Sequence, residues 1–249
     1  MLEVRDLSVS YGKKEILTNV SFTLEKGTVT ALLGANGCGK TTLIKALCGL
    51  LPCEGSRRLD GCDLRELSTK ETAQQIGYIP QRSGISLSLT ALDVVLMVFS
   101  PRLGLLQQPT GAMEAQARQT LAQLGLGADT AYLTLSEGQK QLCILARTLV
   151  MDAKVLLLDE PESALDLQNR YGLFEHLRGR LQDRAVLAVL HDPQLALQTA
   201  DKLILLKDGT VHAVLHPKTD SPETMEQAFC GIYGRVRLHK IEDTIVMVR

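Results

Sequence analysis

The sequence predicts an α/β fold with a mainly parallel β-sheet, antiparallel strands at the N-terminal end and a helical insertion. Three observations support this prediction. Polar and apolar residues alternate with the period of a strand through the first part of the chain. Farther along, short apolar segments typical of buried strands alternate with segments of helical period. A glycine-rich loop at residues 34–41 follows an apolar strand and opens a helix, as in strand–loop–helix units of parallel sheets.

The N-terminal part of the chain is expected to form strands before its first helix. Gly12 and Gly27 mark the turns between these strands. Pro52 ends the helix that the glycine-rich loop opens. In chain order, the expected elements are strands at residues 2–12, 20–27 and 28–34, a helix at residues 41–51, a strand and turn at residues 56–64, a helix near residues 69–75 and a strand at residues 76–80.

Residues 89–126 are expected to be mainly helical and to form an insertion between two strand–helix units. Thr90 is suited to cap the helix of residues 91–99, because its hydroxyl can accept a bond from a backbone N–H of the first turn. The helical period resumes at residues 111–126. The residues that interrupt it in between are Pro101, Gly104 and Pro109.

The C-terminal part alternates again between helices and strands. The expected elements are a helix at residues 136–151, a strand at 154–159, a helix at 164–181, a strand at 184–191, a helix opened by Asp192 and Pro193, a hairpin at 202–215, and two short strands around Glu242 and Asp243 within residues 235–249. We therefore expect a single domain over residues 1–249, with a helical subdomain at about 84–151 and a short β tail at about 232–249.

The composition is that of an ordinary globular protein. The 249 residues are 45% hydrophobic and 22% charged, and the net charge of -1 gives no reason to expect a nucleic-acid partner. No apolar run approaches the roughly 18 residues that span a bilayer, and the charged N-terminal segment does not resemble a signal peptide. We therefore expect a cytoplasmic protein that reaches a membrane only through a partner. The cysteines form no CxxC pair and are expected to be free thiols.

The glycine-rich loop has the spacing of a phosphate-binding site. Its sequence, GANGCGKT, fits the pattern G-x-x-x-x-G-K-[ST] residue for residue. The glycines let successive backbone N–H groups turn toward phosphate oxygens, and the helix N-terminus adds partial positive charge. Lys40 would reach the β- and γ-phosphates, and the Thr41 hydroxyl would ligate Mg²⁺. The residues expected to bind nucleotide here are Gly34, Asn36, Gly37, Cys38, Gly39, Lys40, Thr41 and Thr42.

A pair of carboxylates completes this site. The segment VLLLDEP at residues 155–161 reads as a buried strand that delivers Asp159 at its C-terminal end, where α/β sheets bind their ligands. Asp159 suits the coordination shell of Mg²⁺, and Glu160 could accept a proton from an attacking water or orient it. A surface acidic pair after a core strand is the alternative, which the presence of Lys40 and Thr41 makes the weaker one.

With these motifs in place, the chain resembles the ATP-binding subunits of ABC transporters over essentially all of residues 1–220. The resemblance implies a P-loop NTPase of the ABC type that hydrolyses ATP with Mg²⁺. The segments that carry it stand in the family's order: Tyr11 at the aromatic A-loop position, GANGCGKTT as Walker A, IPQ ending in Gln81 at the Q-loop, LSEGQ at residues 135–139 as the ABC signature, VLLLDE as Walker B, SALD at residues 163–166 as the D-loop, and His191 as the switch histidine.

The resemblance also implies roles for these residues. Tyr11 would stack on adenine, and a strand-end tyrosine without such a role is the alternative. Gln81 would contact Mg²⁺ or the attacking water and link the site to the helical insertion. His191 would bind the γ-phosphate and position the water for Glu160, with a core histidine as the alternative. Asp166 would cross an interface between two copies.

By the family's arrangement, the signature completes the ATP site of a second copy. Two chains would pack head to tail, so that the glycine-rich loop of one faces the signature of the other. Ser136, the neighbouring N–H groups and the helix N-terminus would then hold the γ-phosphate from the opposite side. The signature residues are Leu135, Ser136, Glu137, Gly138 and Gln139.

Two residues depart from the family's usual pattern or raise a question of chemistry. Glu137 stands where the signature usually has glycine, and we expect it to be tolerated because its side chain can point to solvent. Cys38 lies close to a helix N-terminus, where thiols can be acidified. We expect alkylation of Cys38 to block ATP hydrolysis and bound ATP to protect it; the alternative is that Cys38 only fills a variable position.

The resemblance extends to the class of transporter. Residues 91–104 and the short tail resemble ATPases of iron–siderophore, haem, vitamin B12 and molybdate importers. We expect the membrane subunit to dock at residues 91–104, although their apolar positions could belong to the insertion's own core. The implied partners are a second copy, two integral-membrane permease subunits and, indirectly, a periplasmic or extracellular substrate-binding protein. The chain itself is expected at the cytoplasmic face of the membrane, held there by the permease subunits. A soluble ABC ATPase in cofactor assembly, such as iron–sulfur cluster formation, is the alternative.

Overall fold

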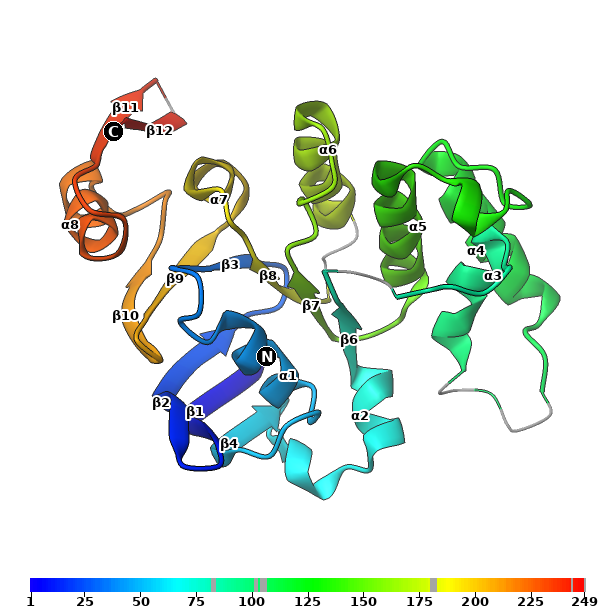
Figure 1. Ribbon diagram of the computed structural model, residues 1–249, viewed down its shortest axis with the longest axis horizontal. Helices are drawn as coiled ribbons and strands as arrows, with labels where there is room; N and C mark the ends of the chain where they lie inside the picture. The colour runs from blue at the N-terminus through cyan, green and yellow to red at the C-terminus, as the bar shows by residue number, and fades with distance from the viewer. Residues whose placement is uncertain (82–83, 101–102, 104–106, 180–182, 243, 249) are drawn as a thin grey trace.

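A computed structural model describes residues 1–81, 84–100, 103, 107–179, 183–242 and 244–248 (Figure 1). It confirms the predicted α/β fold with a mainly parallel sheet and a separate N-terminal antiparallel sheet. The strands are β1 (Leu2–Tyr11), β2 (Lys14–Leu24), β3 (Val29–Gly34), β4 (Glu54–Leu59), β5 (Cys62–Asp63), β6 (Ile76–Ile79), β7 (Val155–Asp159), β8 (Ala185–Val189), β9 (Lys202–Lys207), β10 (Thr210–Leu215), β11 (Arg237–Ile241) and β12 (Thr244–Val248). The helices are α1 (Lys40–Leu47), α2 (Thr69–Gln75), α3 (Ala91–Leu96), α4 (Gly111–Gln123), α5 (Glu137–Val150), α6 (Leu167–Arg178), α7 (Pro193–Thr199) and α8 (Pro222–Tyr233), with 3-10 turns η1 (Leu64–Glu66), η2 (Met97–Phe99) and η3 (Tyr132–Thr134).

The central sheet has six strands in the order β10-β9-β3-β8-β7-β6. Strands β6, β7, β8, β3 and β9 run parallel to one another, and β10 pairs antiparallel with β9 at the edge of this sheet. Strands β3, β7 and β8 are buried along their whole length, because helices and a second sheet cover both faces. The C-terminal ends of β3, β6, β7 and β8 therefore meet at one edge of the sheet, where the candidate site lies.

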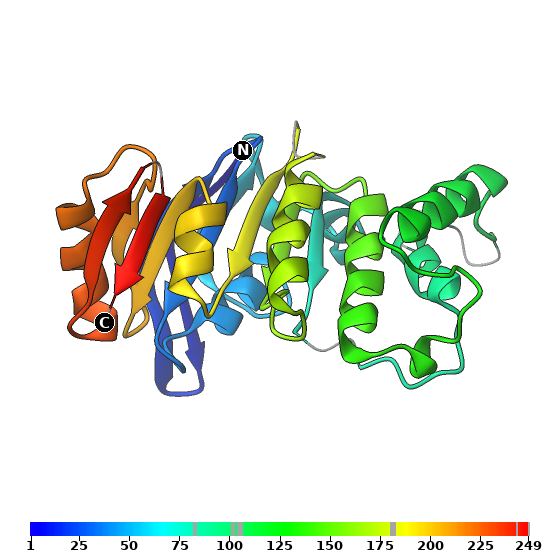
Figure 2. The same ribbon diagram turned by 90° about the horizontal axis from the view of Figure 1, so that it is seen from above.

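The two faces of the central sheet are covered differently. One face packs with α1 against the antiparallel sheet β2-β1-β4-β5, through residues such as Leu32, Leu43 and Val4. The other face packs against α5, α6, α7 and α8, through residues such as Leu158 and Phe229. Figure 2 shows an elongated molecule, with α3, α4 and α5 at one end and α8, β11 and β12 at the other.

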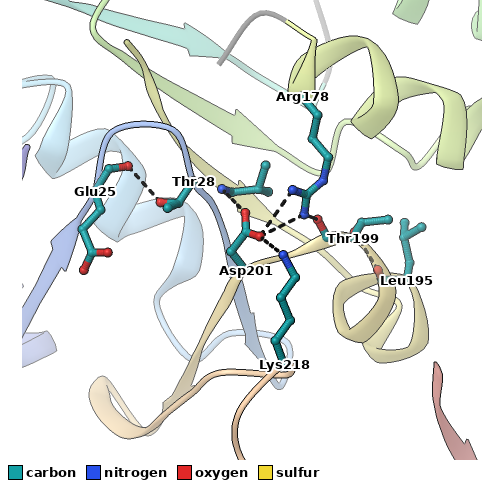
Figure 3. Close-up of polar contacts among 8 residues, drawn as sticks. Glu25, Thr28, Arg178, Leu195, Thr199, Asp201 and Lys218 are labelled. Atoms are coloured by element: carbon teal, nitrogen blue, oxygen red, sulfur yellow. Dashed lines mark hydrogen bonds and ion pairs between the residues drawn. The ribbon is translucent and has the colours of Figure 1, made fainter. Parts of the chain in front are cut away.

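At the edge of the central sheet opposite the site, Asp201 forms hydrogen bonds and ion pairs with several segments of the chain (Figure 3). One carboxylate oxygen accepts a bond of 3.0 Å from the backbone N–H of Val29, at the start of β3. The other accepts from Lys218 Nζ at 2.8 Å and from the guanidinium of Arg178, the last residue of α6, at 3.3 Å. Burial alone would raise the pKa of Asp201, but Lys218, Val29 and Arg178 lower it below its ordinary value. Asp201 thus links β3 to α6 and to the segment after β10.

Several element boundaries differ from the sequence-based expectation. Helix α8 was not predicted, although Ser221 caps it and Pro222 occupies its first turn. Helix α6 begins at Leu167 rather than residue 164, because Asp166 accepts the N–H of Asn169 and so acts as its N-cap. Strand β2 starts earlier than expected, directly after a turn at Gly12, whose φ is +59°. Of the predicted features, Pro101, Gly104, the end of the helix at residues 180–181, Asp243 and Arg249 lie outside the described residues.

Candidate functional site

The glycine-rich loop connects β3 directly to α1. Gly39 precedes the helix with a φ of +108°, which strains any other residue, and a Cβ at this position would lie 2.6 Å from Leu17 Cδ2, so that side chain would have to shift. Lys40 is 7% exposed, and its ammonium donates to the carbonyls of Gly34 at 2.8 Å and Ala35 at 3.0 Å. The buried lysine therefore lies folded back inside the loop, while Asn36 and Gly37 are exposed and line a cavity beside it.

A hydroxyl and a carboxylate face each other beside this loop. Thr41, in the first turn of α1, donates from its hydroxyl to Asp159 Oδ1 at 3.4 Å. Asp159 is the last residue of β7 and is 4% exposed. Burial raises its pKa, and the bond from Thr41 opposes that rise. The two oxygen donors form a pair of the kind that Mg²⁺ binds together with phosphate oxygens and water; Thr42 lies next along α1 and is half-buried.

Two residues that follow adjacent strands contact the carboxylate of a third, Glu160. Gln81 follows β6, Glu160 follows β7, and His191 follows β8 by two residues. Gln81 Nε2 donates to Glu160 Oε2, and His191 Nε2 contacts Glu160 Oε1. Glu160 has a φ of 53°, in the left-handed region that non-glycine residues rarely adopt, and such strain is typical of functional sites. The structure thus brings together the three residues expected to be catalytic.

The signature forms the start of α5, away from the glycine-rich loop. Ser136 caps the helix: its hydroxyl accepts from Gln139 N–H at 3.2 Å, and the Gln139 side chain accepts from Ser136 N–H at 3.0 Å. The Glu137 side chain is 79% exposed and lies 2.7 Å from Lys140 Nζ, so it points to solvent. A Cβ on Gly138 would lie 3.3 Å from the Ala164 carbonyl, which places the signature beside the D-loop. Leu135 is buried beneath it.

The signature and the phosphate loop line different cavities of the chain. The cavity beside the loop is lined by residues 35–38 and by neighbours such as Lys14 and Asp208. The cavity beside the signature is lined by Glu137, Lys140 and Gln141. Among the described residues the two cavities have no lining residue in common, and the cavity beside the signature also includes Gln81, which contacts Glu160.

Tyr11, Asp166 and Cys38 have different surroundings. Tyr11 ends β1 and is 50% exposed, so its ring is accessible for stacking. The carboxylate of Asp166 accepts from Asn169 N–H at 2.8 Å and from its amide Nδ2 at 3.0 Å. Cys38 is buried, and burial raises the pKa of its thiol even though Lys40 acts in the opposite direction. Desolvation of the thiolate therefore outweighs the opposing effect of Lys40, so Cys38 is not acidified by its place near the helix N-terminus, and the effect of its alkylation stays a prediction.

Sequence reasoning missed one buried residue of the site, Glu162. Its Oε1 accepts a bond of 3.0 Å from the backbone N–H of His191. Burial raises the pKa of Glu162, and the N–H of His191 opposes that rise. The sequence signal that could have identified Glu162 was a further carboxylate two residues after Glu160, in the segment that leaves the core strand.

The strand–loop–helix unit with its buried lysine, and a carboxylate at the end of a nearby parallel strand, define a P-loop nucleoside triphosphatase. Comparison with known proteins narrows the class. Residues 17–163 match the model of the ABC transporter family. The chain belongs to this family and is an ATP-binding, ATP-hydrolysing member of it.

Similar proteins cover nearly the whole chain. The hemin import ATP-binding protein HmuV of Vibrio cholerae is 36% identical over 253 aligned positions, covering 97% of this chain and 95% of its own. A protein of Helicobacter pylori named as a probable iron chelatin transport ATP-binding protein is 38% identical over 214 positions, 84% of each chain. A solved structure described as a metal-chelate-type ABC transporter in an inward-facing conformation matches with a TM-score of 0.80 and 26% identity, over 99% of this chain and 95% of that one.

Proposed function

We propose that this chain is the ATP-hydrolysing subunit of a binding-protein-dependent importer of metal chelates, of the iron–siderophore, haem, cobalamin or molybdate type. The observation that carries the proposal is the similarity to the hemin import protein over 97% of this chain. The relative named for iron chelatin transport and the metal-chelate-type transporter structure support the same substrate class. No helix among the described residues is long and apolar enough to cross a bilayer. The chain would work at the cytoplasmic face of the membrane, held there by two permease subunits.

ATP binds at the glycine-rich loop in this proposal. Lys40 exchanges its contacts with the loop carbonyls for the β- and γ-phosphates, and Tyr11 stacks on adenine. Thr41 and Asp159, with Gln81, would hold Mg²⁺, which when bound would supply positive charge beside the phosphates. Within the described part of the chain, no cluster of three or more His, Cys, Asp or Glu side chains could hold a metal alone. An ion at Thr41 and Asp159 would therefore take its remaining ligands from ATP and water.

Hydrolysis centres on Glu160. Its carboxylate accepts the proton of the attacking water or orients that water, because Gln81 and His191 hold its two oxygens in place. His191 is 46% exposed on its side chain and can also reach a γ-phosphate from the surface of the site. The positions of these three groups, at the ends of three adjacent parallel strands, keep them together without a long flexible loop.

Two copies assemble head to tail around two ATP molecules. The phosphate loop and the signature line different cavities of one chain, and this separation supports the arrangement. The N-terminus of α5, with the N–H groups of Glu137 and Gly138, supplies the opposite wall. Asp166 lies on the exposed segment before α6, where a second copy could contact it.

An apolar groove between the sheet and the helical insertion is the docking site for the membrane subunit. It is lined by residues of α2, β6, η2 and α5, including Tyr78 and Met97, and by Met151, which directly follows α5. Leu50 and Met97 on its rim are 57% and 37% exposed. Of the segment expected to dock, α3 buries Ala91, Leu92, Val94 and Val95 in the core, so η2 rather than α3 faces the partner. Residues 101, 102 and 104 of that segment lie outside the described residues.

Co-purification tests this function. The tagged chain is expressed in its own host, extracted from membranes in mild detergent, and its partners are identified by mass spectrometry. A polytopic membrane protein in equal amount is expected. Leu50→Asp should lower its recovery by about tenfold or more, whereas Val214→Asp, an exposed apolar residue on β10, should not. If only soluble partners bind and the chain is absent from membranes, the function is that of an assembly ATPase instead.

A further inference from the structure

Glu162 is a buried carboxylate that the reaction does not require as an acid or base. It lies two residues after Glu160 and is 3% exposed. Its Oε2 is buried and has no hydrogen-bond partner among the described residues. A buried carboxylate with an unpaired oxygen is unfavourable for folding. Stability alone therefore does not account for this side chain.

The contact that Glu162 does make is with the backbone of His191. Oε1 accepts the His191 N–H at 3.0 Å, so the side chain after β7 holds the segment after β8. On the preceding residue, Leu190 N–H donates to Leu32 O at 3.2 Å, which anchors the same segment to β3. The backbone that carries the imidazole is thus fixed from two neighbouring strands.

Two carboxylates hold His191 from opposite ends. Glu160 Oε1 contacts the imidazole Nε2, and Glu162 Oε1 binds the backbone N–H. Both carboxylates follow the same strand, β7, so any shift of the β7 loop would move the two contacts together. Because the imidazole itself is half-exposed, its place against Glu160 depends on where its backbone is held.

We propose that Glu162 is a positioning residue for ATP hydrolysis. Its buried carboxylate fixes the backbone of His191, so that the imidazole stays against Glu160. The proposal rests on the roles given above to Glu160 and His191, but not on the transported cargo or on the membrane partner.

Volume-matched substitutions test this without emptying the core. Glu162→Met keeps the length of the side chain and removes the acceptor, whereas Glu162→Gln keeps a carbonyl that can accept the His191 N–H. Steady-state ATP hydrolysis of the full chain is measured for both, alone and combined with His191→Ala. Hydrogen exchange of the His191 amide and the melting temperature are measured on the same samples. Glu162→Leu serves as a second acceptor-free variant where Glu162→Met does not fold.

We expect Glu162→Met to lower kcat about tenfold, because the hydrogen bond that holds the His191 backbone is lost. KM for ATP should not change. The His191 amide should exchange faster, and Glu162→Gln should stay within about twofold of the parent. In the His191→Ala background, Glu162→Met should cause no further loss of kcat.

Two results would overturn the proposal: an unchanged kcat in a folded Glu162→Met chain, or an equal loss of kcat with and without His191. A purely structural role would produce the second result, because lost stability does not depend on the imidazole. If His191→Ala alone keeps the parent kcat, the role of His191 in the proposed function is wrong, and that failure is visible in the single variant.

Discussion

The ammonium group of Lys40 donates a hydrogen bond of 2.8 Å to the carbonyl oxygen of Gly34, at the other end of the same loop. With a second bond to Ala35 O at 3.0 Å, the buried charge is satisfied inside the loop. An incoming phosphate therefore competes for a lysine that is already oriented toward the centre of the loop.

Lys40→Met should remove this interaction with ATP. We expect kcat/KM for ATP to fall at least about 100-fold, because a charge-assisted contact to the transferred phosphate is lost. Lys70→Met, at an exposed position of α2, is the matched control and should leave kcat/KM unchanged. Activity of folded Lys40→Met within threefold of the parent would show that the loop does not hold the phosphates.

Glu160→Gln should separate ATP binding from hydrolysis. The amide keeps the size of the side chain but cannot accept the proton of water, so hydrolysis should fall roughly 100-fold or more. ATP would then persist, and light scattering should show a dimer with ATP and a monomer without it. A variant that stays monomeric with saturating ATP would rule out self-pairing without the membrane subunits.

Mixing two inactive variants tests whether each ATP site is shared between copies. Lys40→Met damages the phosphate loop, and Gly138→Asp damages the signature, where the Ala164 carbonyl already lies close. In a mixed dimer one site carries both defects and the other carries neither. We expect equal mixing to restore hydrolysis at roughly a quarter of the sites. Activity equal to the sum of the separate variants would contradict a shared site.

Asp201→Asn should lower the free energy of unfolding and make that free energy depend less on pH in the acid range. The folded-state pKa of Asp201 is depressed, so its contribution to stability is present above the unfolded value near 3.8 and is lost as the pH falls through the folded value. At pH 7 we expect a loss of about 2 kcal/mol, or a Tm roughly 4–8 °C lower. Glu25→Gln is the control, since the Glu25 side chain is 56% exposed and 3.7 Å from Lys202. Parallel pH–stability curves for the parent and Asp201→Asn would contradict this assignment.

Cys38 should react slowly with alkylating reagents in the folded chain. Its thiol is buried and its pKa is raised, so at pH 7.5 labelling should be roughly tenfold or more slower than at the exposed Cys62. ATP should slow it further, and the adduct, once formed, should block hydrolysis because it occupies the phosphate loop. Peptide mass spectrometry with parallel ATPase assays measures both. Full modification of Cys38 with unchanged activity would refute this expectation.

Features encoded within a few residues could be predicted from the sequence. The phosphate loop, the buried strand that ends in Asp159, and the cap of α5 by Ser136 each depend on local spacing, so their chemistry can be read before the fold is known. The order of the motifs along the chain was enough to predict the fold class. Helix α8 had an equally local signal in Ser221 and Pro222, but no element was assigned to residues 216–234.

The tertiary structure alone decided which side chains meet. Gln81, Glu160 and His191 converge because β6, β7 and β8 are adjacent parallel strands, and strand order results from packing between distant segments. The raised pKa of Cys38 likewise follows from burial, and the hydrogen bond from His191 N–H to Glu162 follows from packing. Local spacing specifies neither. Thus the sequence by itself determined the motifs and the reaction class, whereas the tertiary structure decided the contacts, since each contact joins residues far apart in the chain.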